Sequence, residues 1–171
     1  MNKNSFFKYK ESINSLLNNV SDAQINKTIK MIRDTSRRKG KVYIVGNGGS
    51  ASIASHVSVD FAKVSRIQSS TFNNANLITC FANDYDYENW VTEAIKAYTN
   101  KNDMLILISS SGKSKNIVNA AKYCKKNSID LVTLSGFKKN NPLSKLGKIN
   151  FYIDSSQYNF IEMSHHIILV Y

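Results

Sequence analysis

Apolar residues at helical intervals in the first 39 positions predict two α-helices. The second helix would open with a capping box at Ser21–Gln24, where a serine is followed three residues later by a glutamine. The positions predicted to face inward are Phe6, Ile13, Leu16, Leu17 and Val20 in the first helix, and Ile25, Ile29 and Ile32 in the second.

After Gly40 the pattern changes to short, continuous apolar runs, which are typical of strands buried on both faces of a sheet. The predicted strands are Val42–Val45, Leu77–Phe81, Met104–Ile108, Leu131–Leu134 and Phe151–Ile153, and helical patterns separate them at 50–63, 88–99, 115–127, 142–146 and from 159 onward. This alternation predicts an α/β fold with a doubly wound, five-stranded parallel sheet flanked by helices. We expect a single domain over 1–171, with an N-terminal helix pair (1–39) and an α/β core (40–171).

The amino-acid composition limits which ligands and which cellular compartment we expect for the protein. The 23 Lys and Arg residues against 12 Asp and Glu give a formal charge of +11, which fits either a solvated basic surface or an anionic ligand such as a phosphate. A nucleic-acid partner is not indicated, since no zinc-finger, RRM or helix-turn-helix pattern accompanies the charge. Two cysteines make no disulfide framework, and no signal peptide or membrane-spanning run is present, so we expect a cytoplasmic protein. The last apolar run stops at Tyr171, and truncation is one interpretation of that end.

Two loops carry the candidate chemistry. The first, Gly46-Asn-Gly-Gly-Ser50, lies between a buried strand and a helix, where free backbone N–H groups and the positive end of the helix attract an anion. It matches neither GxGxxG nor the P-loop, so a dinucleotide or nucleoside triphosphate is not indicated. A tight turn without a ligand is the alternative.

The second loop, Ser109-Ser-Ser-Gly-Lys-Ser114, also follows a strand and precedes a helix. Its four hydroxyls and the helix N-terminus can donate hydrogen bonds to a phosphate monoester. Ser114 can equally be an ordinary N-cap. Both loops should lie at the carboxyl edge of the sheet, where ligands bind in this class of fold.

These two loops, together with His56 and Asn83-Asp-Tyr85, resemble the SIS (sugar isomerase) domain, and more narrowly the phosphoheptose isomerase family. The resemblance implies a flavodoxin-like, Rossmann-like fold and the interconversion of sedoheptulose 7-phosphate with a heptose 7-phosphate for surface polysaccharide such as lipopolysaccharide or capsule. It also implies a homotetramer with shared active sites, in which the N-terminal helices would serve subunit packing.

The resemblance assigns a substrate-binding role to residues of three segments. These are Asn47, Gly48, Gly49, Ser50, Asn83, Asp84, Ser109, Ser110, Ser111 and Ser114. Asp86 replaces a glycine that is usual in the family at the turn after the Asn-Asp pair, which can change the conformation of that loop.

The acid/base residues depart from the family pattern. His56 and Asp60 stand where the family has a histidine and a glutamate, while Glu162 replaces a glutamine and Val170 a catalytic histidine. An enediol isomerisation needs a base and an acid close to the substrate, and we expect Asp60, Glu162, His166 and His56 to supply them. His56 with Asp60 can instead be a structural i,i+4 pair, and His165 with His166 can simply stabilise the helix or a subunit contact.

No cofactor is required by the resemblance, although some relatives bind zinc at the equivalents of His56, Asp60, Glu162 and Val170. The first three can still coordinate Zn²⁺ here. Because the catalytic histidine is missing at Val170, a second function stays open: a non-catalytic sensor of phosphosugars or a tetrameric adaptor of the kind that associates with a replication initiator.

Overall fold

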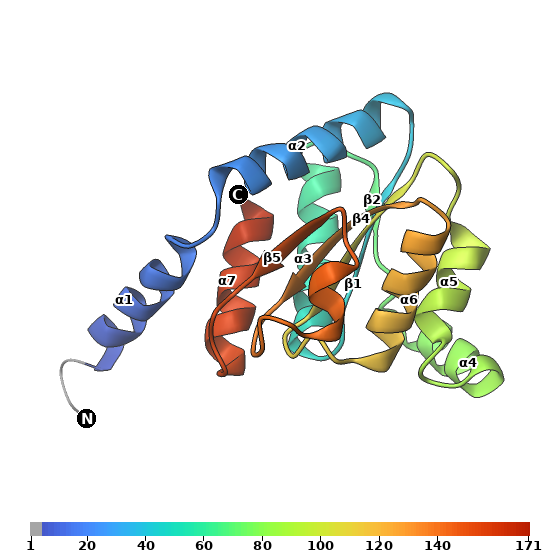
Figure 1. Cartoon of the computed structure of the whole chain (residues 1–171). Coiled ribbons are helices and arrows are strands. Elements are labelled where there is room, and N and C mark those ends of the chain that lie inside the picture. The colour runs from blue at the N-terminus through green and yellow to red at the C-terminus, as the bar shows by residue number, and fades with distance from the viewer. Residues whose placement is uncertain (1–4) are drawn as a thin grey trace.

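The fold is a parallel sheet of five strands between two layers of helices, as the computed structural model of residues 5–171 shows (Figure 1). In chain order the elements are α1 (Ser5–Leu17), α2 (Asp22–Arg37), β1 (Val42–Val45), α3 (Gly49–Lys63), β2 (Ser69–Ser70), α4 (Ala75–Tyr85), α5 (Trp90–Tyr98), β3 (Met104–Ser109), α6 (Lys115–Lys126), β4 (Asp130–Ser135), the 3₁₀ helix η1 (Pro142–Lys145), β5 (Ile149–Tyr152) and α7 (Tyr158–Val170). The strands lie in the order β2-β1-β3-β4-β5. The predicted fold class and the parallel sheet are therefore confirmed.

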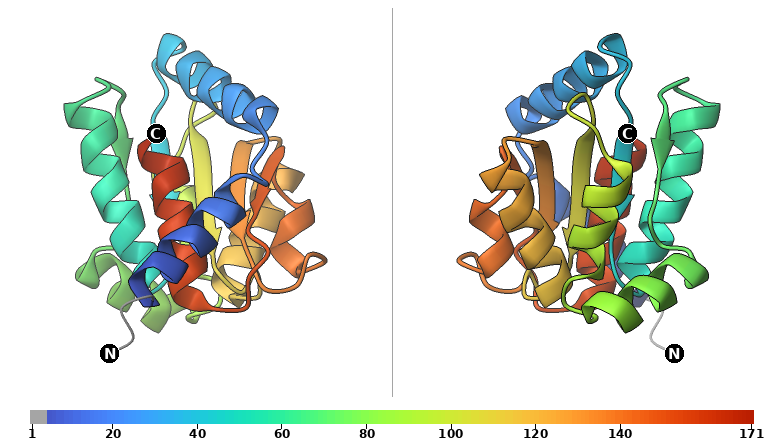
Figure 2. Two further views of the ribbon diagram at one scale, coloured as in Figure 1. Left: turned by 90° about the vertical axis from the view of Figure 1, so that its left-hand side faces the viewer. Right: turned by 90° about the vertical axis from the view of Figure 1, so that its right-hand side faces the viewer.

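Alternate residues of each central strand face opposite layers. Tyr43 and Val45 of β1 pack with α4, α5 and α6, whereas Val42 and Ile44 pack with α2, α3 and α7. In Figure 2, the layer with α3 and α7 faces the viewer in the left view, and the layer with α4, α5 and α6 faces the viewer in the right view. Burial on both faces explains why the strands read as continuous apolar runs.

One predicted strand is wrong. The run Leu77–Phe81 belongs to α4, whose N-terminus is capped by Asn74 accepting a hydrogen bond from the backbone N–H of Leu77 at 2.9 Å. Four of its residues, Leu77, Ile78, Phe81 and Ala82, pack against the core, a helical spacing within a short run that also fits a strand. The fifth strand is instead β2, a polar pair at the sheet edge that has no apolar signature.

The capping box is also wrong. Ser21 stands at the N-cap of α2 but makes no side-chain capping hydrogen bond. The side chain of Gln24 instead donates to the backbone oxygen of Asn150 at 2.9 Å, which fastens α2 to β5.

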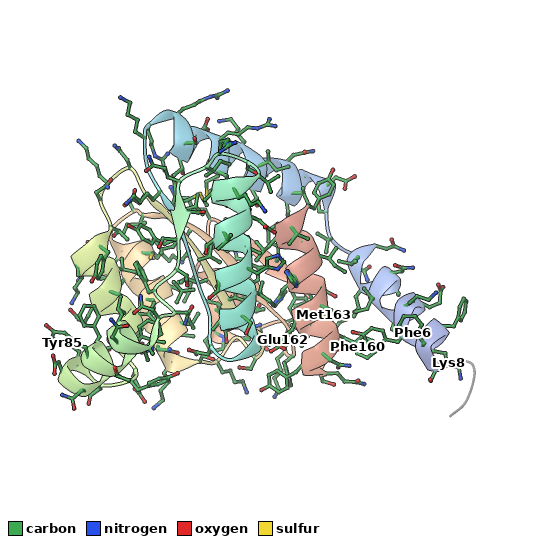
Figure 3. All side chains as sticks on the ribbon, turned by 180° about the vertical axis from the view of Figure 1, so that it is seen from behind. Phe6, Lys8, Tyr85, Phe160, Glu162 and Met163 are labelled. Carbon is green, nitrogen blue, oxygen red and sulfur yellow. The ribbon has the colours of Figure 1, made fainter. Side chains whose placement is uncertain are left out.

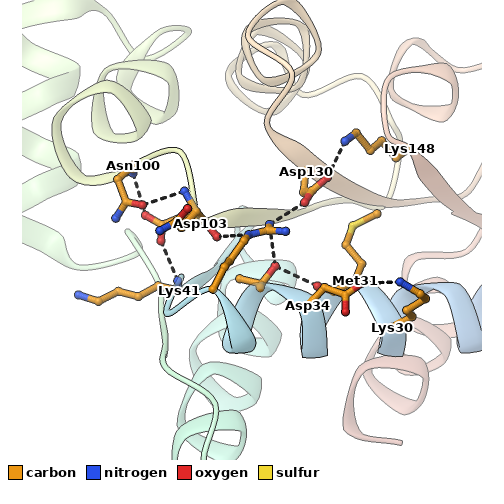
Figure 4. Close-up of polar contacts among 11 residues, drawn as sticks. Lys30, Met31, Asp34, Lys41, Asn100, Asp103, Asp130 and Lys148 are labelled. Carbon is orange, nitrogen blue, oxygen red and sulfur yellow. Dashed lines mark hydrogen bonds and ion pairs between the residues drawn. The ribbon is translucent and has the colours of Figure 1, made fainter.

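The amino-terminal edge of the sheet is held by a charged network (Figure 4). Arg38 donates to Asp130 at 2.6 Å and to the backbone oxygen of Asn102 at 2.8 Å, and Lys148 pairs with Asp130 at 2.6 Å. Burial alone would raise the pKa of Asp130, but the hydrogen bonds from Lys148 and Arg38 hold it below its ordinary value. These charges serve the fold and lie at the edge opposite the two candidate loops.

The first helix lies at the side of the molecule, beside α7 (Figures 1 and 2). Tyr9 of α1 stacks on Phe160 of α7 with ring centroids 5.0 Å apart, and Ile13 is buried. No helix within residues 5–171 is long and apolar enough to cross a membrane. Both cysteines, Cys80 and Cys124, are free.

Candidate active site

The two candidate loops leave the carboxyl ends of β1 and β3, which are neighbouring strands. The chain runs from β1 outward to β2 on one side and later returns to β3 on the other, so the loops flank the point where the strand order reverses. In open parallel sheets this crevice is where ligands bind. The structure thus brings the two loops together, as their positions in the sequence predict.

The first loop is held open by Asn73, a residue that the sequence pattern did not single out. The amide of Asn73 accepts from the backbone N–H of Gly46 at 3.2 Å and donates to its carbonyl oxygen at 2.8 Å. Ser50 is buried against Gly46, and Gly48 has a φ of +54°. Within residues 5–171 no hydrogen bond occupies the backbone N–H groups of Asn47, Gly48 and Gly49, which suits an anion.

The second loop has the polar surface expected of a phosphate site. The hydroxyl of Ser109 donates a hydrogen bond to the hydroxyl of Ser114 at 3.0 Å. Ser114 is the N-cap residue of α6, but its side chain makes no capping hydrogen bond to the helix. The hydroxyl of Ser110 is buried and has no partner among the described residues. The backbone N–H groups of Ser111, Ser114 and Lys115 are likewise unused in the described chain. These donors meet at the positive end of α6, where a phosphate is favoured.

Asn141 supports the second loop from behind and was missed by the sequence analysis. This buried asparagine donates to Ser135, Gly136 and Lys138 and accepts from the backbone N–H groups of Leu143 and Ser144. Gly112 has a φ of +65°, and a Cβ there would collide with the Asn141 side chain. The shape of the serine loop therefore depends on the segment after β4.

The proposed acid/base residues lie along the seam between α3 and α7. Glu162 of α7 touches Gly49 at the start of α3, so its carboxylate lies beside the first loop (Figure 3). Further along both helices, His56 Nδ1 and His166 Nε2 are 2.8 Å apart, and His56 Nε2 is 3.1 Å from Asp60. With a rise of 1.5 Å per residue, His56 lies about 10 Å along α3 from Gly49.

The contacts of His56 determine which group donates and which accepts in the hydrogen bonds that link His166, His56 and Asp60. An ionised Asp60 can only accept, so a neutral His56 donates from Nε2, and its Nδ1 then accepts from His166 Nε2. In this arrangement the Nδ1 lone pair of His166 has no hydrogen-bond partner within residues 5–171, so it can act as a base. Burial and the neighbouring His56 lower the pKa of His166, while Asp60 opposes them.

His165 is different from its neighbour. It is fully buried, and its Nε2 lies 3.3 Å from the backbone oxygen of Ser135 at the end of β4. Burial lowers the pKa of His165 to about 4. His165 is therefore a neutral structural residue, in agreement with the helix-stabilising alternative, whereas His166 reaches the seam.

Asn83 and Asp84 end α4 and are exposed, with the Asn83 amide donating to Asp84 at 2.9 Å. No hydrogen bond in residues 5–171 joins either of them to the two loops. Asp86 follows with φ +67° and ψ 151°, a conformation that favours glycine and that matches its position at a turn.

The residues named for zinc do not form a cluster that fits the ion. Among the described residues no group of three or more histidine, cysteine and acidic side chains is arranged to hold a metal. Both nitrogens of His56 are engaged, by His166 and Asp60, and Glu162 lies at the other end of α3. We therefore derive no chemical step through zinc.

A cavity of about 630 Å³ lies away from the loops, between α2, the C-terminal half of α3 and the end of α7. Apolar side chains such as Ile29, Phe61 and Leu169 line it, and Asp60 is at its margin. Its lining also includes polar side chains, among them Arg33, Arg37 and Ser36, but no part of the serine loop.

Comparisons with known proteins identify the family of the chain. The family described as the SIS domain matches residues 8–136. The phosphoheptose isomerase of Helicobacter pylori is 32% identical over 155 residues, covering 86% of this chain and 80% of that protein. The chain belongs to the phosphoheptose isomerase family of SIS domains. A Campylobacter concisus member is 30% identical over 142 residues, covering 80% and 75% of the two chains.

Solved structures of phosphoheptose isomerases share the fold. The Neisseria gonorrhoeae protein superposes with a TM-score of 0.86 at 19% identity, covering 95% of this chain and 90% of that one. The Francisella tularensis protein gives 0.87 at 22%, covering 97% and 91%. Val170, which the sequence resemblance aligns with the family's catalytic histidine, is 51% exposed near the end of α7.

Proposed function

We propose that this chain is an aldose–ketose phosphosugar isomerase acting on sedoheptulose 7-phosphate. The observation that carries the proposal is the placement of the His166–His56–Asp60 chain along the helix seam, about 10 Å from Gly49 of the first loop. A seven-carbon sugar with C–C bonds of about 1.5 Å spans a comparable length. Its phosphate would lie on the second loop and its carbonyl end beside the histidines.

The reaction is a proton transfer within the substrate. His166 Nδ1 removes a proton from C1 of the ketose while an acid protonates the oxygen on C2, which gives the 1,2-enediol. Return of a proton to C2 and loss of the proton from the C1 hydroxyl yield the aldose. Asp60 accepts from His56 and so stabilises the positive charge that develops on the linked imidazoles. Glu162, which precedes His166 by one turn on the same face of α7, is the candidate for the second proton carrier.

A turnover assay with matched variants tests this function. Sedoheptulose 7-phosphate is the substrate, and ketohexose phosphates serve as comparison sugars. We expect His166→Asn to lower kcat by 10²–10⁴-fold, the contribution typical of a general base, and Ser111→Ala chiefly to raise KM. Lys126→Ala, at the exposed C-terminal end of α6 and away from both loops, serves as the control. No isomerisation of any sugar by the wild-type protein would contradict the proposal.

The sensor alternative is favoured by one observation, the exposed Val170 in place of the catalytic histidine. It predicts tight phosphosugar binding that Ser111→Ala abolishes, without turnover and without any effect of Asp60→Asn on binding. The same assay therefore separates the two functions.

We infer further that the chain forms a homotetramer with shared sites, using its N-terminal helices for packing. Phe6 and Phe7 of α1 are 69% and 57% exposed, and the outer faces of α3 and α7 expose Val59, Met163 and Ile167. Apolar patches of this kind mark interaction surfaces. Light scattering during size-exclusion chromatography tests this, and a monomer at assay concentration would contradict it.

The proposed setting is the cytoplasm, with the aldose phosphate supplied to synthesis of a heptose-containing lipopolysaccharide or capsule. The relationship to the phosphoheptose isomerases of Helicobacter pylori and Campylobacter concisus supports it. Loss of heptose from the surface polysaccharide of a deletion strain is the expected outcome.

A further inference from the structure

The side chain of Asn47 lies where three separate elements meet. Its Nδ2 donates to Asn116 Oδ1 at 2.9 Å, and Asn116 Nδ2 donates back to Asn47 Oδ1 at 3.0 Å. The hydroxyl of Tyr87 donates to the same Asn47 oxygen at 3.3 Å. The first loop is thereby joined to the start of α6 and to the turn between α4 and α5.

These contacts use both acceptor positions of the Asn47 amide oxygen, because a carbonyl oxygen has two lone pairs. Asn47 therefore cannot accept a hydrogen bond from a sugar hydroxyl without releasing Asn116 or Tyr87. Asn116 is almost fully buried, and its own oxygen also accepts from the backbone N–H of Ile117 at 3.0 Å. The pair is thus anchored on the α6 side.

The turn that carries Tyr87 is itself fastened to α6. Glu88 forms an ion pair with Lys115, and Asn119 Nδ2 donates to the backbone oxygen of Glu88 at 3.1 Å. The positive φ of Asp86 directs the chain into this turn. Tyr87 is 56% exposed, so its hydroxyl contact is not a by-product of core packing.

We propose that Asn116 and Tyr87 are positioning residues that act through Asn47 to fix the separation of the two loops. The proposal rests on the phosphosugar function argued above. Inorganic phosphate needs only the second loop, whereas a phosphosugar must also reach past the first loop to the helix seam. Loosening the Asn47 contacts should therefore weaken phosphosugar binding while leaving phosphate binding nearly intact.

Tyr87→Phe is the most selective test, because it removes one hydroxyl from an exposed ring. We expect KM for sedoheptulose 7-phosphate to rise about fivefold, as loss of a single hydrogen bond commonly produces, with kcat nearly unchanged. The dissociation constant for inorganic phosphate, measured by titration calorimetry, should stay within about twofold. Tyr85→Phe, an exposed tyrosine two residues away, is the matched control and should match wild type.

Asn116→Ala is the second variant of this experiment. It should raise KM more than Tyr87→Phe, and the double variant should be no worse than Asn116→Ala, because both residues act through one amide. Additive effects, or an equal loss of phosphate affinity, would overturn the proposal, as would a Tyr87→Phe protein that matches wild type. If Asn116→Ala fails to fold, Tyr87→Phe decides alone. A wild-type protein that neither binds nor converts phosphosugars would instead refute the proposed function itself.

Discussion

The buried histidine of α7 should make the protein sensitive to acid in a measurable way. Burial lowers the pKa of His165 to about 4, whereas an unfolded histidine titrates near 6.5. Between these values the unfolded chain binds more protons than the folded one, so stability is fully present above pH 6.5 and is lost as the pH falls toward 4. The maximum loss is about 3 kcal/mol, of which about 2 kcal/mol is reached at pH 5.

The assay is urea unfolding at pH 7.5 and pH 5.0, with the protein concentration fixed because an oligomer's stability depends on it. His165→Gln keeps an N–H that can reach the Ser135 oxygen but does not titrate. We expect the free energy of unfolding to change with pH by about 2 kcal/mol less in His165→Gln than in wild type. Carboxylates such as Asp130 contribute equally to both proteins and cancel. An identical pH dependence in the two proteins would refute the reasoning.

Three further predictions concern the site and its turns. Asp86→Gly should stabilise the protein by about 1 kcal/mol, since it relieves a backbone conformation that favours glycine, and a lower urea midpoint would contradict this. Gly112→Ala should lower both the urea midpoint and the affinity for inorganic phosphate, because its Cβ meets Asn141 at positive φ; an unchanged affinity would argue against the loop as the phosphate site. The acid limb of kcat/KM should lie below pH 6.5, because the pKa of His166 is lowered and the base must be unprotonated, and a limb above pH 6.5 would exclude His166 as that base.

The fold could be predicted wherever burial left a signature in the sequence. Strands such as β1 and β3 are buried on both faces and are therefore continuously apolar. The run Leu77–Phe81 was wrongly predicted as a strand, because five apolar or β-branched residues in a row fit a strand as well as part of a short helix. The edge strand β2 has only two serines and no apolar contrast to reveal it.

The loops of the site could be predicted because glycine and serine clusters between a strand and a helix have a physical purpose. The residues that hold those loops could not. Asn73, Asn116 and Asn141 are isolated asparagines whose partners are far away in sequence, and nothing local distinguishes them from other polar positions. The pairing of His56 with His166 likewise depends on α3 and α7 packing side by side across 110 positions.

The most direct test of the account is a crystal structure of the protein with sedoheptulose 7-phosphate bound. We expect the phosphate to accept hydrogen bonds from the backbone N–H groups of Ser111 and Ser114, and the carbonyl end of the sugar to approach His166. A phosphate bound elsewhere, for example beside Arg33 and Arg37 in the cavity between α2, α3 and α7, would contradict the assignment of the serine loop and, with it, the proposed reaction.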